Sequence, residues 1–231
     1  MREPNRIQPD LVHGLPYWRL SVQDHVANHV PGLKGIDLDK ISLLDLGCGL
    51  GYMLARLSYS LPRGARLVGI DVNKTVVARA EALAGKIGDR TKTEFRCVDA
   101  ENLDFKEGYF DVIVANFSFS VFRKPGKVAY RVARILKPGG KLIATEVSSL
   151  SVLGKIGELL DAASGHSYYN LLSPSSLANL FVPFGLRVNR VARVPLKAKV
   201  LKRDLKIPPR LSPVFLIELS KPDSFALKRK K

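Results

Sequence analysis

The chain has 231 residues, 46% of them hydrophobic and 25% charged, so it is long enough to bury the core of one domain and lacks the composition of a disordered protein. Its formal net charge is +16, and its two cysteines, Cys48 and Cys97, exclude a disulfide framework and a zinc site. No apolar run has the length of a membrane span and the first residues lack the apolar core of a signal peptide, so we expect a cytoplasmic location.

Residues 1–40 are predicted to form a helical cap, and residues 41–147 alternate between strand-like and helix-like segments. Short β-rich runs lie near 41–46, 65–70, 93–98, 110–115 and 141–147, and helical stretches lie near 51–60, 74–86 and 124–136. This spacing is typical of right-handed crossovers between parallel strands. The chain is therefore predicted to be a single α/β domain whose core, residues 41–147, is a doubly wound sheet.

The first predicted strand leads into a glycine-rich loop, Asp45-Leu46-Gly47-Cys48-Gly49-Leu50-Gly51. Glycine tolerates positive φ angles and lets a ligand lie against bare main chain, so the loop is typical of a nucleotide-binding turn. The dinucleotide pattern G-x-G-x-x-G would need a third glycine at position 52, where the chain has Tyr52. The acidic Asp45 is unfavourable beside a pyrophosphate and favourable beside a cationic ligand, which also argues against a dinucleotide.

Acidic residues also lie at the ends of the next two predicted strands. Asp71 ends the second strand, and an Asp-Ala pair, Asp99 and Ala100, ends the third. An aspartate at such a position can instead be a solvated turn residue or a helix cap. For the third strand, Glu101 could cap the next helix and Asp99 could simply end the strand. Asp111 lies at the entrance of the fourth strand, away from the expected ligand end, and is interpreted as structural.

Two later segments extend the pattern. Phe110–Asn116 is predicted to be the fourth strand, and Arg134-Ile135-Leu136-Lys137-Pro138-Gly139-Gly140 is predicted to be a helix end and a turn before the fifth strand. Together with the glycine loop and the two acids, these segments resemble the motifs of the class I S-adenosylmethionine-dependent methyltransferases. The resemblance is strongest to methyltransferase type 11 and the enzymes of ubiquinone and menaquinone biosynthesis, and it covers residues 41–147.

The resemblance implies a Rossmann-like sheet of seven strands, mostly parallel, with the last strand antiparallel between the fifth and the sixth. It also implies S-adenosylmethionine as the methyl donor, with Asp71 accepting hydrogen bonds from the ribose hydroxyls and Asp99 meeting the adenine amine. The cofactor-binding residues that it implies are Asp45, Gly47, Cys48, Gly49, Gly51, Asp71, Val72, Asp99, Ala100 and Asn116.

The segment after the fourth strand, residues 116–122, normally supplies the acceptor contacts in this family. Here it lacks the two prolines found in methyltransferases that act on base or amide amines, and it is similar to the small-molecule branch, as is Glu146 after the fifth strand. We therefore expect a small-molecule or lipid-like acceptor. Because transfer from a sulfonium needs a base only when the nucleophile arrives protonated, few catalytic residues are required, and Asn116 and Ser118 are candidates.

Histidines are the remaining candidates for chemistry. His166 lies in a predicted insertion, residues 148–172, where it is a candidate catalytic base near neutral pH. His25 and His29 have the i, i+4 spacing of two ligands on one helical face, but no third ligand is near, so no metal site is predicted.

The rest of the chain is predicted to complete the same domain. The insertion 148–172 is expected to lie over the active site, and Ser173 followed by Pro174 is typical of the start of a helix. The remaining predicted segments are a sixth strand (187–194) and a seventh strand (214–219), both within a C-terminal region (173–220), and a basic tail (221–231).

Positive charge is concentrated in residues 187–231, which hold 14 Lys or Arg against three acidic residues. Such a region could bind RNA phosphates or an anionic membrane surface, and it could equally be a solvated, solubilising surface. Three functions therefore stay open: a methyltransferase for a small-molecule or lipid-like acceptor, an RNA methyltransferase that uses the basic region, and a non-catalytic binding protein with this fold.

Overall fold

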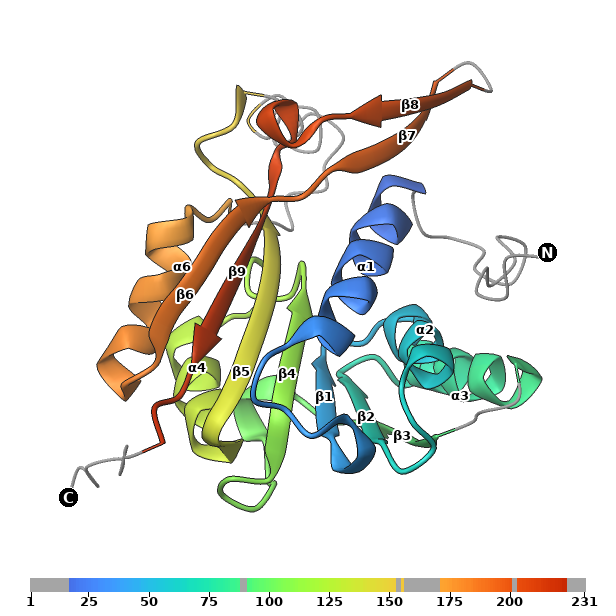
Figure 1. Cartoon of the computed structure of the whole chain (residues 1–231), viewed down its shortest axis with the longest axis vertical. Helices are drawn as coiled ribbons and strands as arrows, with labels where there is room; N and C mark the ends of the chain where they lie inside the picture. The colour runs from blue at the N-terminus through green and yellow to red at the C-terminus, as the bar shows by residue number, and fades with distance from the viewer. Residues whose placement is uncertain (1–16, 88–90, 153–154, 156–170, 201–202, 224–231) are drawn as a thin grey trace.

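A computed structural model describes residues 17–87, 91–152, 155, 171–200 and 203–223 and contains a central seven-stranded sheet (Figure 1). Its strands are β1 (Ser42–Leu46), β2 (Arg66–Asp71), β3 (Lys92–Cys97), β4 (Phe110–Asn116), β5 (Leu136–Val147), β6 (Arg187–Arg193) and β9 (Val214–Ser220). They lie in the order β3-β2-β1-β4-β5-β9-β6, and β9 pairs antiparallel with both β5 and β6. The predicted Rossmann-like sheet with an antiparallel last strand is confirmed.

Helices cover both faces of this sheet. They are α1 (Tyr17–His29), α2 (Tyr52–Ser60), α3 (Lys74–Ile87), α4 (Pro125–Ile135) and α6 (Pro174–Phe181), with the 3-10 turns η2 (Val30–Gly32), η3 (Leu38–Lys40), η4 (Ala100–Asn102), η5 (Val182–Phe184) and η6 (Pro209–Leu211). Alternate residues of each strand point to opposite faces, so Leu43 joins the core under α1 and α2 while Leu44 joins the core under α4 and α6. No helix within the described ranges is long and apolar enough to cross a bilayer.

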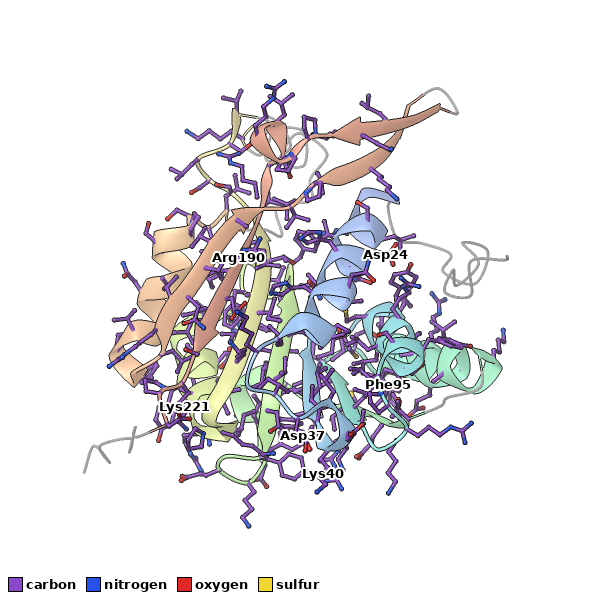
Figure 2. The ribbon with its side chains drawn as sticks, in the orientation of Figure 1. Asp24, Asp37, Lys40, Phe95, Arg190 and Lys221 are labelled. Carbon is purple, nitrogen blue, oxygen red and sulfur yellow. The ribbon has the colours of Figure 1, made fainter. Side chains whose placement is uncertain are left out.

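Of the helical cap predicted for residues 1–40, residues 1–16 lie outside the described residues, and the described part contains the helix α1, packed beside α2 on one face of the sheet (Figure 1). Val22 and Val26 are fully buried in the core below it. Asp24, labelled in Figure 2, accepts a hydrogen bond from the Tyr52 hydroxyl at 2.9 Å. At the C-terminal end of α1, His29 Nε2 lies 3.1 Å from Glu218 Oε2 of β9. These contacts fasten the middle of α1 to α2 and its C-terminal end to the sheet.

The predicted turn at Pro138–Gly140 is instead part of β5, and this is a correction to the sequence-based boundary. Strand β5 begins at Leu136, which pairs with Phe110, and the next pair joins Val112 to Lys141, so the intervening residues form a bulge. Gly139 donates its N–H to the Lys221 carbonyl at 2.8 Å, and the Lys221 N–H donates to the Gly140 carbonyl at 3.0 Å. Pairing with the chain after β9 therefore holds this segment within the sheet, although Gly139 itself has a φ of 74°.

A second small sheet is not predicted by the sequence, in which residues 196–207 are part of the basic region 187–231. It is the hairpin of β7 (Leu196–Val200) and β8 (Arg203–Ile207). This hairpin follows β6 and precedes β9 in the chain, and it lies outside the main sheet (Figure 1). Leu196 pairs with Ile207, and both pack against the core under α1. The Lys197 N–H also donates to Ser21 Oγ of α1 at 3.1 Å. The base of the hairpin is thereby attached to the cap helix.

Candidate active site

The glycine loop joins β1 to α2 and is built around two close approaches. Gly47 has a φ of 75°, and a Cβ there would lie 2.7 Å from Ser118 Oγ. Gly51 also has a φ of 75°, and a Cβ there would lie 2.9 Å from Ala80 and 3.0 Å from the Phe95 ring (Figure 2 labels Phe95). Gly47 therefore brings the loop against the segment after β4, whereas Gly51 lets α2 pack closely on α3 and β3.

A cavity of about 390 Å³ opens at the carboxyl ends of the parallel strands, where ligands bind in sheets of this kind. The residues predicted from the sequence that line it are Gly47, Cys48, Gly49, Asp71, Val72, Asp99, Ala100, Asn116 and Ser118. Asp45 and Gly51 do not line it, because Asp45 is buried behind the loop and Gly51 starts α2. His166 lies outside the described residues.

Asp71 and Asp99 both face the cavity, and both also hold backbone. Asp71 Oδ2 accepts from the Gly49 N–H at 3.1 Å and Asp71 Oδ1 from the Asn73 N–H at 3.0 Å. Asp99 Oδ1 accepts from the Glu101 N–H at 2.8 Å and caps η4, which is the capping role that the sequence left open. Since each carboxylate oxygen has two acceptor sites, these bonds leave both acids able to accept from a ligand in the cavity.

Burial sets the protonation of the groups around the loop. It raises the pKa of the Asp45 carboxyl to about 7, and the charge of Asp71 adds to the rise. Burial, followed by the charges of Asp45 and Asp71, also raises the pKa of the Cys48 thiol. Cys48 therefore stays a neutral thiol at neutral pH and is not a nucleophile, because thiol reactivity requires the thiolate.

The segment after β4 is held by a buried acid, Glu146 of β5. Glu146 Oε1 accepts from the Phe119 N–H at 2.7 Å, and burial raises the pKa of this carboxyl to about 7 against the lowering effect of its hydrogen bonds. Phe117, whose φ is 55°, is a non-glycine residue in the left-handed region. Such strain persists only where surrounding contacts impose it, and it is frequent at ligand sites.

The two catalytic candidates in this segment have different polar partners. Ser118 Oγ donates to the Leu46 carbonyl at 2.7 Å, so its proton is already used to hold the segment against β1. Asn116 Oδ1 accepts from Thr145 Oγ1 at 2.8 Å, while its Nδ2 is buried and has no hydrogen-bond partner within the described ranges. A buried amide donor without a partner is unfavourable unless a ligand completes it. Asn116 is thus suited to contact a ligand, and Ser118 to position the segment.

Arg19 and Gln23 of α1 are among the cavity residues that sequence reasoning missed. They are separated by four residues and therefore lie on one side of the helix. The Arg19 guanidinium carbon is 5.3 Å from the centroid of the Phe117 ring, which places its charge near the β4 end of the cavity. Their helical spacing was visible in the sequence, but nothing in it indicated which side of α1 faces the cavity.

Comparison with known proteins agrees with this geometry. Residues 44–144 match the family model described as a methyltransferase domain. The chain is 33% identical over 101 residues to a phosphatidylethanolamine N-methyltransferase of Cereibacter sphaeroides, covering 44% of this chain and 48% of that protein. It is 29% identical over 141 residues to the ubiquinone/menaquinone biosynthesis C-methyltransferase UbiE of Klebsiella pneumoniae, covering 55% of this chain and 56% of that protein. The chain thus spans about half the length of these curated relatives.

A solved structure extends the likeness to most of the chain. The methyltransferase in complex with the Trm112 activator of Haloferax volcanii aligns with a TM-score of 0.68 at 20% identity, over 91% of both chains. The sheet order and the cavity at its carboxyl edge define a Rossmann-like nucleotide-binding fold. Residues 44–144, which match the methyltransferase domain model, contain most of β1, all of β2, β3 and β4 and most of β5, and therefore most of the residues that line the cavity.

The burial of Asp45 predicts a pH-dependent stability. Its folded-state pKa of about 7 exceeds the unfolded value of about 3.9, so its ionisation disfavours the folded state as the pH rises. The free energy of unfolding of Asp45→Asn should match that of the unsubstituted protein near pH 4 and exceed it above pH 7 by on the order of 4 kcal/mol. Denaturant unfolding at a series of pH values measures this difference.

The matched control for this experiment is Asp104→Asn, because Asp104 is an exposed acid that does not line the cavity. This variant measures what the loss of one exposed carboxylate does to the free energy of unfolding at each pH. A difference for Asp45→Asn that changes with pH no more than that of Asp104→Asn would contradict the role given to burial. Glu146 is present in every variant, so its own titration cancels from the comparison.

Proposed function

We propose that this chain is an S-adenosylmethionine-dependent methyltransferase that acts on a small-molecule or lipid-like acceptor. The observation that carries the proposal is that the glycine loop, Asp71, Asp99 and Asn116 line one cavity, and that the Asn116 amide nitrogen has no hydrogen-bond partner within the described ranges. A cavity of about 390 Å³ is within the usual size range of small-ligand sites. The match over residues 44–144 supports the same chemistry.

The order of the strands suggests how the donor lies. Because β3, β2, β1 and β4 are consecutive in the sheet, the residues at their carboxyl ends follow one another along the cavity. We place the adenine beside Asp99, the ribose hydroxyls on Asp71 and the methionine part over Gly47. Asn116 then lies at the end of the cavity where the methyl group and the acceptor meet.

Arg19 completes this placement at the methionine end. The donor's amino-acid part carries a carboxylate, and Arg19 and Arg123 are the cations that line the cavity within the described ranges. Arg19 lies beside Phe117, after β4, so it is near the expected position of that carboxylate. The ammonium of the same group would favour the ionised form of Asp45 behind the glycine loop. The ligand's carboxylate would thus lie near Arg19, and its ammonium on the side of the glycine loop behind which Asp45 is buried.

The residues of this chain contribute mainly positioning. When bound, the donor supplies a methyl group that is already activated by its sulfonium, so orientation and exclusion of water are the protein's main tasks. Helix α1 covers one side of the cavity, and Phe117, Val121 and Phe122 line it with apolar surface. Ser118 and Glu146 hold the segment that carries them. No side chain described in the cavity is required as a base for an unprotonated nucleophile.

An apolar or small acceptor is supported by two observations. The acceptor end of the cavity is lined by aromatic and aliphatic side chains, which suit an apolar group better than a polynucleotide. The relatives named above are described as acting on a phospholipid and in quinone biosynthesis. The basic charge of residues 187–231 supports the second candidate, an RNA methyltransferase, through its attraction for phosphates.

Asp71→Ala tests the donor site directly. Loss of charged hydrogen bonds to both ribose hydroxyls should weaken S-adenosylmethionine binding by about 10- to 100-fold, measured by calorimetry. Asp104→Ala, an exposed acid outside the cavity, should bind like the unsubstituted protein. Absence of binding by the unsubstituted protein would favour the non-catalytic alternative, and equal binding by Asp71→Ala would contradict the placement of the ribose.

Arg19 is tested by shortening the ligand. S-adenosylhomocysteine keeps the amino-acid group, and 5′-methylthioadenosine lacks it. Arg19→Gln should therefore weaken the binding of S-adenosylhomocysteine by about 10- to 100-fold and leave the binding of 5′-methylthioadenosine unchanged. Arg63→Gln is the matched control, since Arg63 is exposed and outside the cavity. Equal weakening of both ligands would show that Arg19 shapes the cavity and does not bind the carboxylate.

The acceptor class is tested by methyl labelling. The full chain is incubated with cell extract and methyl-labelled S-adenosylmethionine, and the extract is separated into RNA, protein and lipid or small-molecule fractions. We expect the label in the lipid or small-molecule fraction, and the Asp71→Ala protein should transfer much less of it. Label confined to RNA would replace the proposed acceptor by the RNA alternative.

A further inference from the structure

Two segments distant in the sequence meet at the carboxyl edge of the sheet, the edge at which the cavity opens. One follows β5 and the other, which includes η6, precedes β9 (Figure 1). The Ser148 N–H donates to the Pro213 carbonyl at 2.8 Å, and this bond places the two segments side by side. We call the exposed residues Leu150, Val152, Lys155, Arg210 and Leu211 of these segments the apical patch.

Large aliphatic side chains in the apical patch are open to solvent. Leu150 is 70% exposed, Val152 is 73% exposed and Leu211 is 57% exposed. Single exposed apolar residues are ordinary, but several on adjoining segments form a surface of the kind that contacts a partner or a membrane. The same segments contain no aromatic residue and no acid between 148 and 155 or between 205 and 213.

Positive charge borders these aliphatic side chains. Lys155 and Arg210 lie in the patch itself, and both are exposed. Lys197 and Lys206 are directly paired across the β7–β8 hairpin, so they point to the same face of it, and both are exposed. Leu196 and Ile207 occupy the opposite, packed face. The hairpin therefore turns a basic face to solvent at the same end of the molecule.

We propose that the apical patch and the adjoining hairpin are a docking surface for an anionic phospholipid bilayer. An anionic bilayer interacts favourably with both the aliphatic and the basic side chains, because aliphatic side chains enter the acyl boundary while Lys and Arg contact the anionic headgroups. RNA phosphates would also bind the Lys and Arg side chains, but exposed Leu and Val would add nothing to RNA binding. RNA bases stack on aromatic residues, which these segments lack. The inference rests on the proposed function, since docking here brings the cavity to the layer that holds a lipid-like acceptor.

The experiment is co-sedimentation of the full chain with vesicles of phosphatidylcholine alone or mixed with phosphatidylglycerol. Binding should require phosphatidylglycerol and weaken as salt is added. The double variant Leu150→Ser, Val152→Ser should reduce partitioning about tenfold, and so should Lys206→Ser, Arg210→Ser. Val182→Ser is the matched control, because Val182 is 52% exposed but lies in η5, after α6 and away from the patch. It should bind vesicles like the unsubstituted chain.

Thermal melting and S-adenosylmethionine binding of each variant check that the fold and the cavity are intact. Equal binding to both kinds of vesicle, or unchanged binding by Leu150→Ser, Val152→Ser, would overturn the proposal. So would binding of an RNA oligomer that depends on Lys206 and Arg210 but not on Leu150 and Val152. Vesicle binding requires no methyl donor, so failure of the docking surface is distinguishable from failure of the proposed function.

Discussion

The N–H groups of Gly47 and Cys48 both donate to the Ile70 carbonyl, at 2.9 and 2.8 Å, and the geometry of the site depends on this pair of hydrogen bonds. They fasten the turn after β1 to the end of β2, so Asp71, the next residue, meets the Gly49 N–H in the same turn. The close approach of Gly47 to Ser118 joins the segment after β4 to this unit. Three strand ends are thereby held as one surface before any ligand arrives.

The acids behind this surface are buried, and burial disfavours their ionised forms. Asp45 behind the loop and Glu146 behind the segment after β4 both have pKa values raised by burial to about 7. Such groups weaken the folded state at neutral pH, and a cationic ligand would recover part of that free energy by favouring the ionised form of Asp45. Stability of the free protein and affinity for a positively charged donor are therefore opposed at this residue.

The alternation of strands and helices was predicted from periodicity, and glycine spacing and strand-end acids are local signals that indicated many of the residues lining the cavity. The antiparallel last strand was implied by the family resemblance. A turn was predicted at Pro138–Gly140 because the pairing that holds this segment in β5 comes from Lys221, far along the chain. The β7–β8 hairpin was missed because its lysines were interpreted only as positive charge, although their alternation with apolar residues in Leu196–Val200 is typical of a strand. Arg19 was missed because only tertiary packing decides which side of α1 faces the cavity.

The antiparallel direction of β9 has a consequence for how such a protein can change. Because β6 runs toward the cavity edge and β9 returns from it, the connection between them needs no crossover helix and can lengthen without disturbing the order of the sheet. The β7–β8 hairpin and η6 occupy this connection. The fold thus accommodates additional chain at the edge of the sheet where the cavity opens, without a change in the order of the strands that form the cavity.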